Sequence, residues 1–208
     1  MAAKDPKFNT KTIHGGQQPD EAYGAVMPPI YQTSTYAQTT PGGHKGYEYS
    51  RSANPTRTAL ENSLASIEGG EYGLAFASGL AAIDAVVKLL GPGDEVISTN
   101  DLYGGSYRIF KKIFEGLGIV FHFVGMQGTD AIKEKINTNT KLIWVETPTN
   151  PMMNIIDIKA VAGLVRNTDI LLAVDNTFAT PYLQLPLQLG ADIVMHSATK
   201  YLGGHSDT

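Results

Sequence analysis

The sequence predicts an α/β protein whose mostly parallel sheet is sandwiched by helices. Short apolar runs alternate with helical patterns from residue 74 onward, and such alternation is typical of strands joined by helical crossovers. Hydrophobic residues make up 42% of the 208 residues, which is enough for one full core. Polar residues directly follow several of the apolar runs, so ligands are expected at the carboxyl ends of the strands.

The first 57 residues are expected to form an extended N-terminal arm. Residues 1–53 are rich in Gly, Pro, Thr and Gln and show little periodicity, so they cannot bury enough apolar surface to fold alone. We therefore expect the arm, residues 1–57, to contact a neighbouring subunit. Residues 58–208 are expected to form one large domain.

Capping and breaking residues set the boundaries of the elements. Asn54 is suited to cap a helix and Pro55 to occupy its first position, and Gly69-Gly70 end that helix. Later helices are expected at 79–90, 104–115, 129–136 and 157–166, with a short one after Tyr182. The expected strands are 74–77, 95–98, 119–124, 142–145, 170–174 and 193–195.

Composition and charge narrow the class of protein. The formal net charge is -4 and the charged residues are dispersed, so we expect no nucleic-acid partner and no membrane. The chain has no cysteine and its five histidines lack metal-ligand spacing, so neither disulfides nor a metal are expected. Because no apolar signal core and no run of ~20 apolar residues occurs, we expect a cytoplasmic protein that acts on small molecules.

The apolar run Ile193–Met195 leads into Ser197-Ala198-Thr199-Lys200. An amine and two hydroxyls thus follow a buried strand at its carboxyl end. A lysine that is partly unprotonated is a nucleophile, and its commonest covalent use is a Schiff base with a carbonyl compound. Pyridoxal phosphate is such a compound, so Lys200 is the expected nucleophile. An ordinary surface lysine after a strand is the alternative.

Two other strand ends suit the same cofactor. Ser78-Gly79-Leu80 opens a helix, where a serine N-cap and a glycine leave backbone N–H groups for a phosphate dianion. Asp175 follows five apolar residues, and a carboxylate there needs a cationic partner such as the protonated ring nitrogen of the cofactor. A plain capped helix and a turn cap are the respective alternatives.

An amide and a phenol complete this edge of the predicted sheet. Asn150 lies in a loop between Pro148 and Pro151, whose rigidity could aim the amide at the phenolic oxygen of the cofactor. Tyr103 precedes two glycines and could stack on a flat cofactor and exchange protons. A simple turn and a core tyrosine are the alternatives.

The arm carries one further pair of side chains that could bind a phosphate. Tyr49 and Arg51 pair an aromatic hydroxyl with a guanidinium, and this pair suits a phosphate. Because the arm is expected to lack a fold of its own, the pair is expected to serve a neighbour's site.

Together these segments resemble the pyridoxal-phosphate enzymes of cysteine and methionine metabolism, the transsulfuration family with the aspartate aminotransferase-like fold (fold type I). The resemblance covers essentially the whole chain. It rests on the ordered motifs Tyr49-Ser50-Arg51, Asn54-Pro55-Thr56, Ala77-Ser78-Gly79, Tyr103-Gly104-Gly105, Glu146-Thr147-Pro148-Thr149-Asn150-Pro151, Val174-Asp175-Asn176-Thr177 and Ser197-Ala198-Thr199-Lys200.

The resemblance implies a role for each matching residue. Lys200 resembles the Schiff-base lysine, Asp175 the partner of the pyridine nitrogen and Tyr103 the stacking tyrosine, and these three are the expected catalytic residues. The implied cofactor-binding residues are Tyr49, Arg51, Ser78, Gly79, Leu80, Tyr103, Asn150, Asp175, Thr177, Ser197, Thr199 and Lys200.

The resemblance also implies an assembly. The expected catalytic unit is a homodimer, in which Tyr49 and Arg51 reach the phosphate site of the adjacent subunit, and two dimers are expected to form a homotetramer. In the family a smaller C-terminal domain carries the arginine that binds the substrate carboxylate. Residues 58–208 are therefore expected to be an incomplete large domain without that C-terminal part.

Within the family the sequence is most similar to cystathionine γ-lyases and γ-synthases. Methionine γ-lyases usually carry a cysteine shortly after the stacking tyrosine, where this chain has Gly105 and Ser106. We expect a carbon–sulfur lyase that converts L-cystathionine into cysteine, 2-oxobutanoate and ammonia by γ-elimination. Cystathionine γ-synthase, cystathionine β-lyase and methionine γ-lyase activities stay open as alternatives, as does an inactive cofactor-binding fragment.

Overall fold

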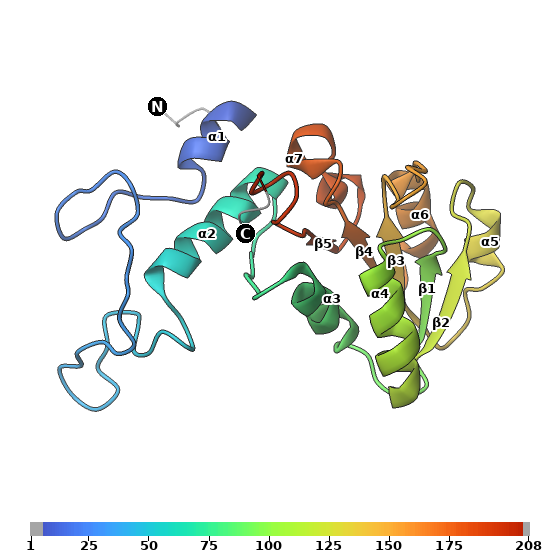
Figure 1. Ribbon diagram of the computed structural model, residues 1–208, viewed down its shortest axis with the longest axis horizontal. Helices are drawn as coiled ribbons and strands as arrows, with labels where there is room; N and C mark the ends of the chain where they lie inside the picture. Colours follow the sequence, from blue (N-terminus) through green and yellow to red (C-terminus); the bar gives the residue numbers. More distant parts are fainter. Residues whose placement is uncertain (1–5, 206–208) are drawn as a thin grey trace. The chain divides into compact units, whose positions relative to one another are not determined.

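The computed structural model describes residues 6–205. The chain divides into two compact units, Met1–Ala75 and Phe76–Thr208. Figure 1 shows helices and long irregular segments in the first unit and the sheet in the second.

The first unit holds α1 (Phe8–His14) and α2 (Pro55–Glu68). The sequence did not predict α1, which packs beside α2. The α2 helix is confirmed with its caps, because the Asn54 side chain accepts a hydrogen bond from the backbone N–H of Thr56 at 2.9 Å. Gly69 ends the helix in the left-handed region at φ 73°, which glycine adopts without steric cost. The expected arm, residues 1–57, lies within this unit.

The second unit is built on a five-stranded parallel sheet in the order β2-β1-β3-β4-β5. Five of the six predicted strands are confirmed, with ends that differ by at most two residues. The strands are β1 (Glu95–Thr99), β2 (Val120–Val124), β3 (Thr140–Glu146), β4 (Leu171–Asp175) and β5 (Ile193–Met195).

The sixth predicted strand, 74–77, is wrong. The structure gives this segment no strand pairing, and the Leu74 and Phe76 side chains are 74% and 46% exposed. The backbone N–H of Ala75 instead donates to the Glu61 side chain at 2.9 Å. An apolar run signals a preference for burial, but a strand also requires a neighbouring strand to take its backbone hydrogen bonds.

Helices connect the strands and follow the predicted pattern. The α4 helix continues through a π-helical turn, η1 (Phe110–Phe114), and a 3₁₀ turn, η2 (Glu115–Leu117), so the predicted helix 104–115 is helical throughout. The other helices are shorter than predicted or begin earlier. The set comprises α3 (Gly79–Val87), α4 (Gly104–Ile109), α5 (Asp130–Lys133), α6 (Ile158–Val165), α7 (Thr180–Leu183) and η3 (Pro186–Leu189).

Each face of the sheet packs its own apolar core. On one face, Ile83 of α3 and Phe110 of η1 join Trp144 of β3, and all three are at most 1% exposed. On the other face, Ile132 of α5 and Val161 of α6 pack with the strands. Because side chains alternate along a strand, β3 contributes to both cores. This confirms the predicted α/β fold with helices on both faces.

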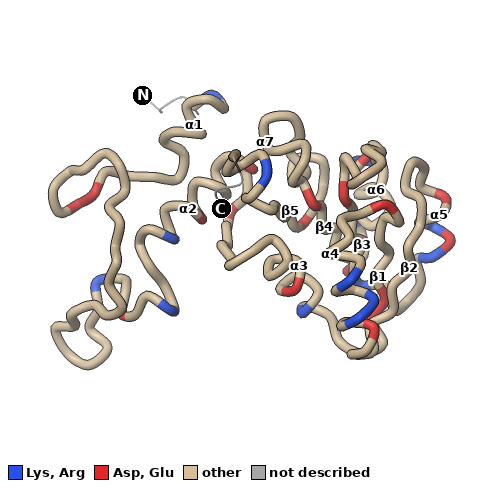
Figure 2. The backbone as a smooth tube through the Cα atoms, viewed as in Figure 1, with Lys and Arg blue, Asp and Glu red and all other residues tan. Residues whose placement is uncertain are grey.

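Charged residues are spread over both units. Figure 2 shows Lys and Arg interspersed with Asp and Glu along the chain. No helix of the described residues is long and apolar enough to cross a membrane.

Candidate active site

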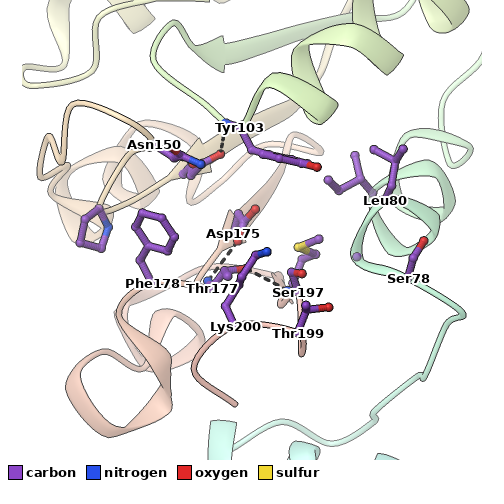
Figure 3. Close-up of a pocket in the computed structure, with 15 residues that line it drawn as sticks. Ser78, Leu80, Tyr103, Asn150, Asp175, Thr177, Phe178, Ser197, Thr199 and Lys200 are labelled. Atoms are coloured by element: carbon purple, nitrogen blue, oxygen red, sulfur yellow. Dashed lines mark hydrogen bonds between the residues drawn. The ribbon is translucent and has the colours of Figure 1, made fainter. Parts of the chain in front are cut away.

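The carboxyl ends of the strands meet at a pocket in the second unit. The loop after β1 leads to α4 and its continuation on one face of the sheet, whereas the loop after β3 leads to α6 on the other face. Neighbouring loops that part in this way leave a crevice at the edge of a parallel sheet, which is where such folds bind ligands. The crevice holds a cavity of about 220 Å³ (Figure 3), lined by Ser78, Gly79, Leu80, Ile83, Tyr103, Glu146, Pro148, Asn150, Asp175, Thr177, Phe178, Met195, Ser197, Thr199 and Lys200.

The structure therefore brings together all ten predicted site residues of the second unit. Tyr49 and Arg51 lie in the first unit and are not among the lining residues. They lie next to each other there, with the guanidinium carbon of Arg51 4.9 Å from the centre of the Tyr49 ring.

One end of the pocket suits a phosphate. Ser78 caps α3, and its hydroxyl accepts a hydrogen bond from the backbone N–H of Ala81 at 3.1 Å. The start of α3 lies against the loop after β5, because a Cβ on Gly79 would lie only 2.9 Å from the Cβ of Ser197. Backbone N–H groups at the helix N-terminus and the Ser197 and Thr199 hydroxyls thus surround one small space.

The floor of the pocket is a buried carboxyl. The Asp175 side chain, at the end of β4, is 6% exposed and accepts a hydrogen bond from the backbone N–H of Thr177 at 3.0 Å. The Thr177 hydroxyl accepts from the backbone N–H of Ser197 at 2.9 Å and so ties the β4 and β5 loops together. Burial raises the pKa of Asp175, and the Thr177 hydrogen bonds and the nearby His196 only partly oppose this. A cation over Asp175 would restore the charged form.

Tyr103 and Lys200 lie on different sides of this floor. Figure 3 shows the Tyr103 ring above Asp175 and the Lys200 side chain extending into the pocket from below it. Tyr103 is 46% exposed. Its ring lies over Gly105, where any Cβ would collide with it. Because it has no Cβ, Gly105 leaves room for the Tyr103 ring at this position.

Glu146 is the one polar residue of the pocket lining to which the sequence analysis assigned no role. It ends β3, pairs in register with Asp175 of β4, and lines the pocket. Burial, together with the negative charge of Asp175, raises its pKa from 4.5 to about 8. A signal was present, because Glu146 directly follows an apolar run just as Asp175 does. Four apolar lining residues were also missed: Ile83, Pro148, Phe178 and Met195.

Comparison with known proteins places the chain in a family. The model of the Cys/Met metabolism PLP-dependent enzymes, where PLP is pyridoxal phosphate, matches residues 9–208. The chain belongs to this family, as the resemblance in the sequence predicted.

Relatives with different activity names are similar to the chain. Over 201 residues it is 55% identical to cystathionine gamma-lyase of Bacillus subtilis, covering 97% of this chain and 53% of the relative. Over 205 residues it is 51% identical to cystathionine beta-lyase of Coxiella burnetii, covering 98% and 53%.

A solved structure confirms the fold. Cystathionine gamma-lyase from Lactobacillus plantarum, complexed with L-serine, superposes with a TM-score of 0.94 at 49% identity, over 98% of this chain and 53% of that one. The chain thus spans about half the length of the relatives it matches.

The pocket residues fit pyridoxal phosphate. Asp175 is a buried carboxyl that gains from a cationic ring nitrogen, the Ser78-Gly79 turn and the loop of Ser197 and Thr199 leave room for a phosphate, and Lys200 offers an amine. These groups are distributed around one cavity, as a flat phosphorylated aldehyde requires.

Proposed function

We propose that the protein is a PLP-dependent carbon–sulfur lyase that cleaves L-cystathionine by γ-elimination. With one water consumed, the products are cysteine, 2-oxobutanoate and ammonia. The observation that carries the proposal is the convergence of the Lys200 amine, the buried Asp175 carboxyl and the α3 N-terminus on one pocket. The family membership supports it.

Most of the predicted pocket residues would hold the cofactor. Asp175, oriented by Thr177, would pair with the ring nitrogen, and the Tyr103 ring would stack on the cofactor. The Asn150 amide would hold the phenolic oxygen. The phosphate would lie among the backbone N–H groups of Gly79 and Leu80 and the hydroxyls of Ser78, Ser197 and Thr199.

The chemistry needs proton transfers at fixed positions. The bound cofactor supplies an electron sink for the charge left at the substrate α-carbon. The Lys200 amine removes the α-proton and then moves a proton at the β-carbon. The Tyr103 hydroxyl donates a proton to the leaving sulfur. Asp175 would stabilise the positive charge on the ring nitrogen of the bound cofactor.

The assembly and location are part of the proposal. We propose a homodimer as the catalytic unit, with Tyr49 and Arg51 serving the neighbour's phosphate site, a homotetramer of two dimers, and a cytoplasmic location. Apolar side chains of the first unit support an association, because Tyr23, Met27 and Ile30 are 95%, 73% and 77% exposed.

Product analysis tests the reaction. The full chain incubated with L-cystathionine should release 2-oxobutanoate, whereas a β-lyase would release pyruvate. Incubation with an O-acylhomoserine and cysteine tests the γ-synthase alternative, which would form cystathionine, and incubation with methionine tests the methionine γ-lyase alternative. Pyruvate as the main keto acid would refute the γ-elimination assignment, and a chain that binds the cofactor without forming any product would be an inactive fragment.

A further inference from the structure

The two loops that carry Tyr103 and Asn150 diverge at the pocket. They follow β1 and β3, which are neighbours in the sheet, but lead to opposite faces of it. Beyond the strand ends no sheet ladder joins them. Some other contact must therefore fix one loop relative to the other.

Glu146 makes that contact from the end of β3. One carboxylate oxygen, Oε2, accepts the backbone N–H of Tyr103 at 2.8 Å. The other, Oε1, accepts the backbone N–H of Asn150 at 3.0 Å. The Glu146 residue is 5% exposed, so water competes little for these two hydrogen bonds.

Asp101 makes the reverse connection. It lies in the loop after β1, and its Oδ2 accepts from the Thr149 hydroxyl, from the backbone N–H of Met152 at 3.1 Å and from the Asn154 amide at 3.2 Å. Glu146 thus reaches from β3 to the loop after β1, and Asp101 reaches from the loop after β1 to the loop after β3. The arrangement joins two loops that the sheet itself leaves apart.

We infer that Glu146 is a positioning residue that fixes Tyr103 and Asn150 relative to each other. It acts through two backbone N–H groups, and it sets the spacing between the ring that stacks on the cofactor and the amide that holds the phenolic oxygen. This inference rests on the proposed function for the roles of Tyr103 and Asn150.

The need for a carboxyl group follows from its two oxygens, each of which accepts a backbone N–H. A glutamine has the same shape, but it offers only one acceptor oxygen, and its NH₂ group would face a backbone N–H. Aspartate keeps both carboxyl oxygens, but its shorter side chain withdraws them from the loops. Both substitutions should therefore loosen the two loops without opening a large cavity.

The test compares Glu146→Gln and Glu146→Asp with a control, Asp192→Ala. Asp192 also accepts a backbone N–H from a neighbouring strand, that of Leu172 at 2.8 Å, but it precedes β5 and lies outside the pocket lining. Three quantities are measured on the full chain. They are amide exchange at Tyr103 and Asn150 without cofactor, the Kd for pyridoxal phosphate, and the attachment of the cofactor to Lys200 after borohydride reduction.

We expect both Glu146 variants to speed amide exchange at Tyr103 or Asn150 and to raise the Kd about tenfold, the size of one or two lost hydrogen bonds. Borohydride should still fix the cofactor to Lys200, and the control should match the wild type in all three measurements. In a Tyr103→Ala background, Glu146→Gln should change the Kd by much less.

Two results would overturn the inference: exchange rates and Kd within twofold of wild type in both Glu146 variants, or a Kd effect that adds fully to that of Tyr103→Ala. A wild-type chain that takes up no pyridoxal phosphate would instead refute the proposed function. In that case the exchange rates at Tyr103 and Asn150 would be the only test of the positioning role.

Discussion

Asp175 and Glu146 end adjacent strands, and both carboxyls are buried at the same pocket. Each has a raised pKa, because burial disfavours the charged form. Their contacts separate their roles. Asp175 faces the space where a cationic ring would lie, whereas Glu146 is engaged by two backbone N–H groups of the surrounding loops.

Replacing Asp175 with Asn should impair turnover more than cofactor attachment. Borohydride should still fix pyridoxal phosphate to Lys200, but turnover of cystathionine should fall by at least about 100-fold, because the ring nitrogen loses the group that keeps it charged. Steady-state rates and the mass of the reduced protein measure the two effects. Asp169→Asn, at an exposed carboxyl before β4, is the control, and near-normal rates in Asp175→Asn would contradict the role.

Glu146 should make stability depend on pH in the cofactor-free chain. Its pKa is raised from 4.5 to about 8, so between these values the folded state holds a proton that the unfolded state has lost. The free energy of unfolding should therefore fall as the pH rises from about 5 to 8, by up to about 1.4 kcal/mol per pH unit from this group, and level off above its folded pKa.

Urea unfolding at several pH values measures this slope. Glu146→Gln cannot titrate, so its slope between pH 5 and 8 should be smaller than that of the wild type, whatever its absolute stability. The Asp192→Ala variant should keep the wild-type slope. Equal slopes in Glu146→Gln and wild type would show that the carboxyl titrates normally.

At the scale of elements, periodicity and capping were enough to predict most of the second unit. Five strands and the helices between them lie where the apolar runs predicted, because each run packs into one of two cores. The convergence of Asp175 and Lys200 followed from the rule that parallel strands bring their carboxyl ends to one edge. Ser78 lines the same pocket although no strand precedes it among the residues that the structure describes.

The wrong and missing predictions also have physical causes. The prediction of a strand at 74–77 was wrong because an apolar pattern does not reveal whether a neighbouring strand is there to pair with it. The α1 helix was missed because Phe8–His14 is short and has no buried residue, so no apolar stripe marks it. The position of Glu146 directly after an apolar run was a signal for a site residue, but its role was not predicted because its two partners are backbone N–H groups, which the sequence does not identify.

A substitution at Gly79 tests the packing of the start of α3 against the loop after β5. Gly79→Ala would place a Cβ 2.9 Å from the Cβ of Ser197, so α3 and the β5 loop must move apart and the phosphate cradle must widen. We expect weaker binding of pyridoxal phosphate by about tenfold, the size of one misplaced hydrogen bond to a charged group. Titration by absorbance measures it.

Gly163→Ala is the matched control for this substitution. Gly163 lies within α6, and a Cβ there would meet no atom within 4 Å. Alanine should stabilise that helix by about 0.5–1 kcal/mol and leave cofactor binding unchanged. Unchanged binding in Gly79→Ala would mean that the cradle tolerates a wider α3–β5 gap.

At the scale of the whole molecule, the pocket belongs entirely to the second unit, and the first unit carries the remaining predicted phosphate ligands, Tyr49 and Arg51. The relatives of this chain are about twice as long as it is. The residues of one unit would thus supply the amine, the partner of the ring nitrogen and the phosphate cradle of the proposed site. The proposed subunit association would supply the further pair of phosphate-binding side chains.

The most direct test of this account is borohydride reduction of the full chain after incubation with pyridoxal phosphate, followed by intact mass and peptide mapping. We predict one cofactor fixed per chain, located on Lys200, and none in Lys200→Ala. A chain that takes up no cofactor, or that carries it on other lysines equally in wild type and Lys200→Ala, would contradict the assignment of this pocket.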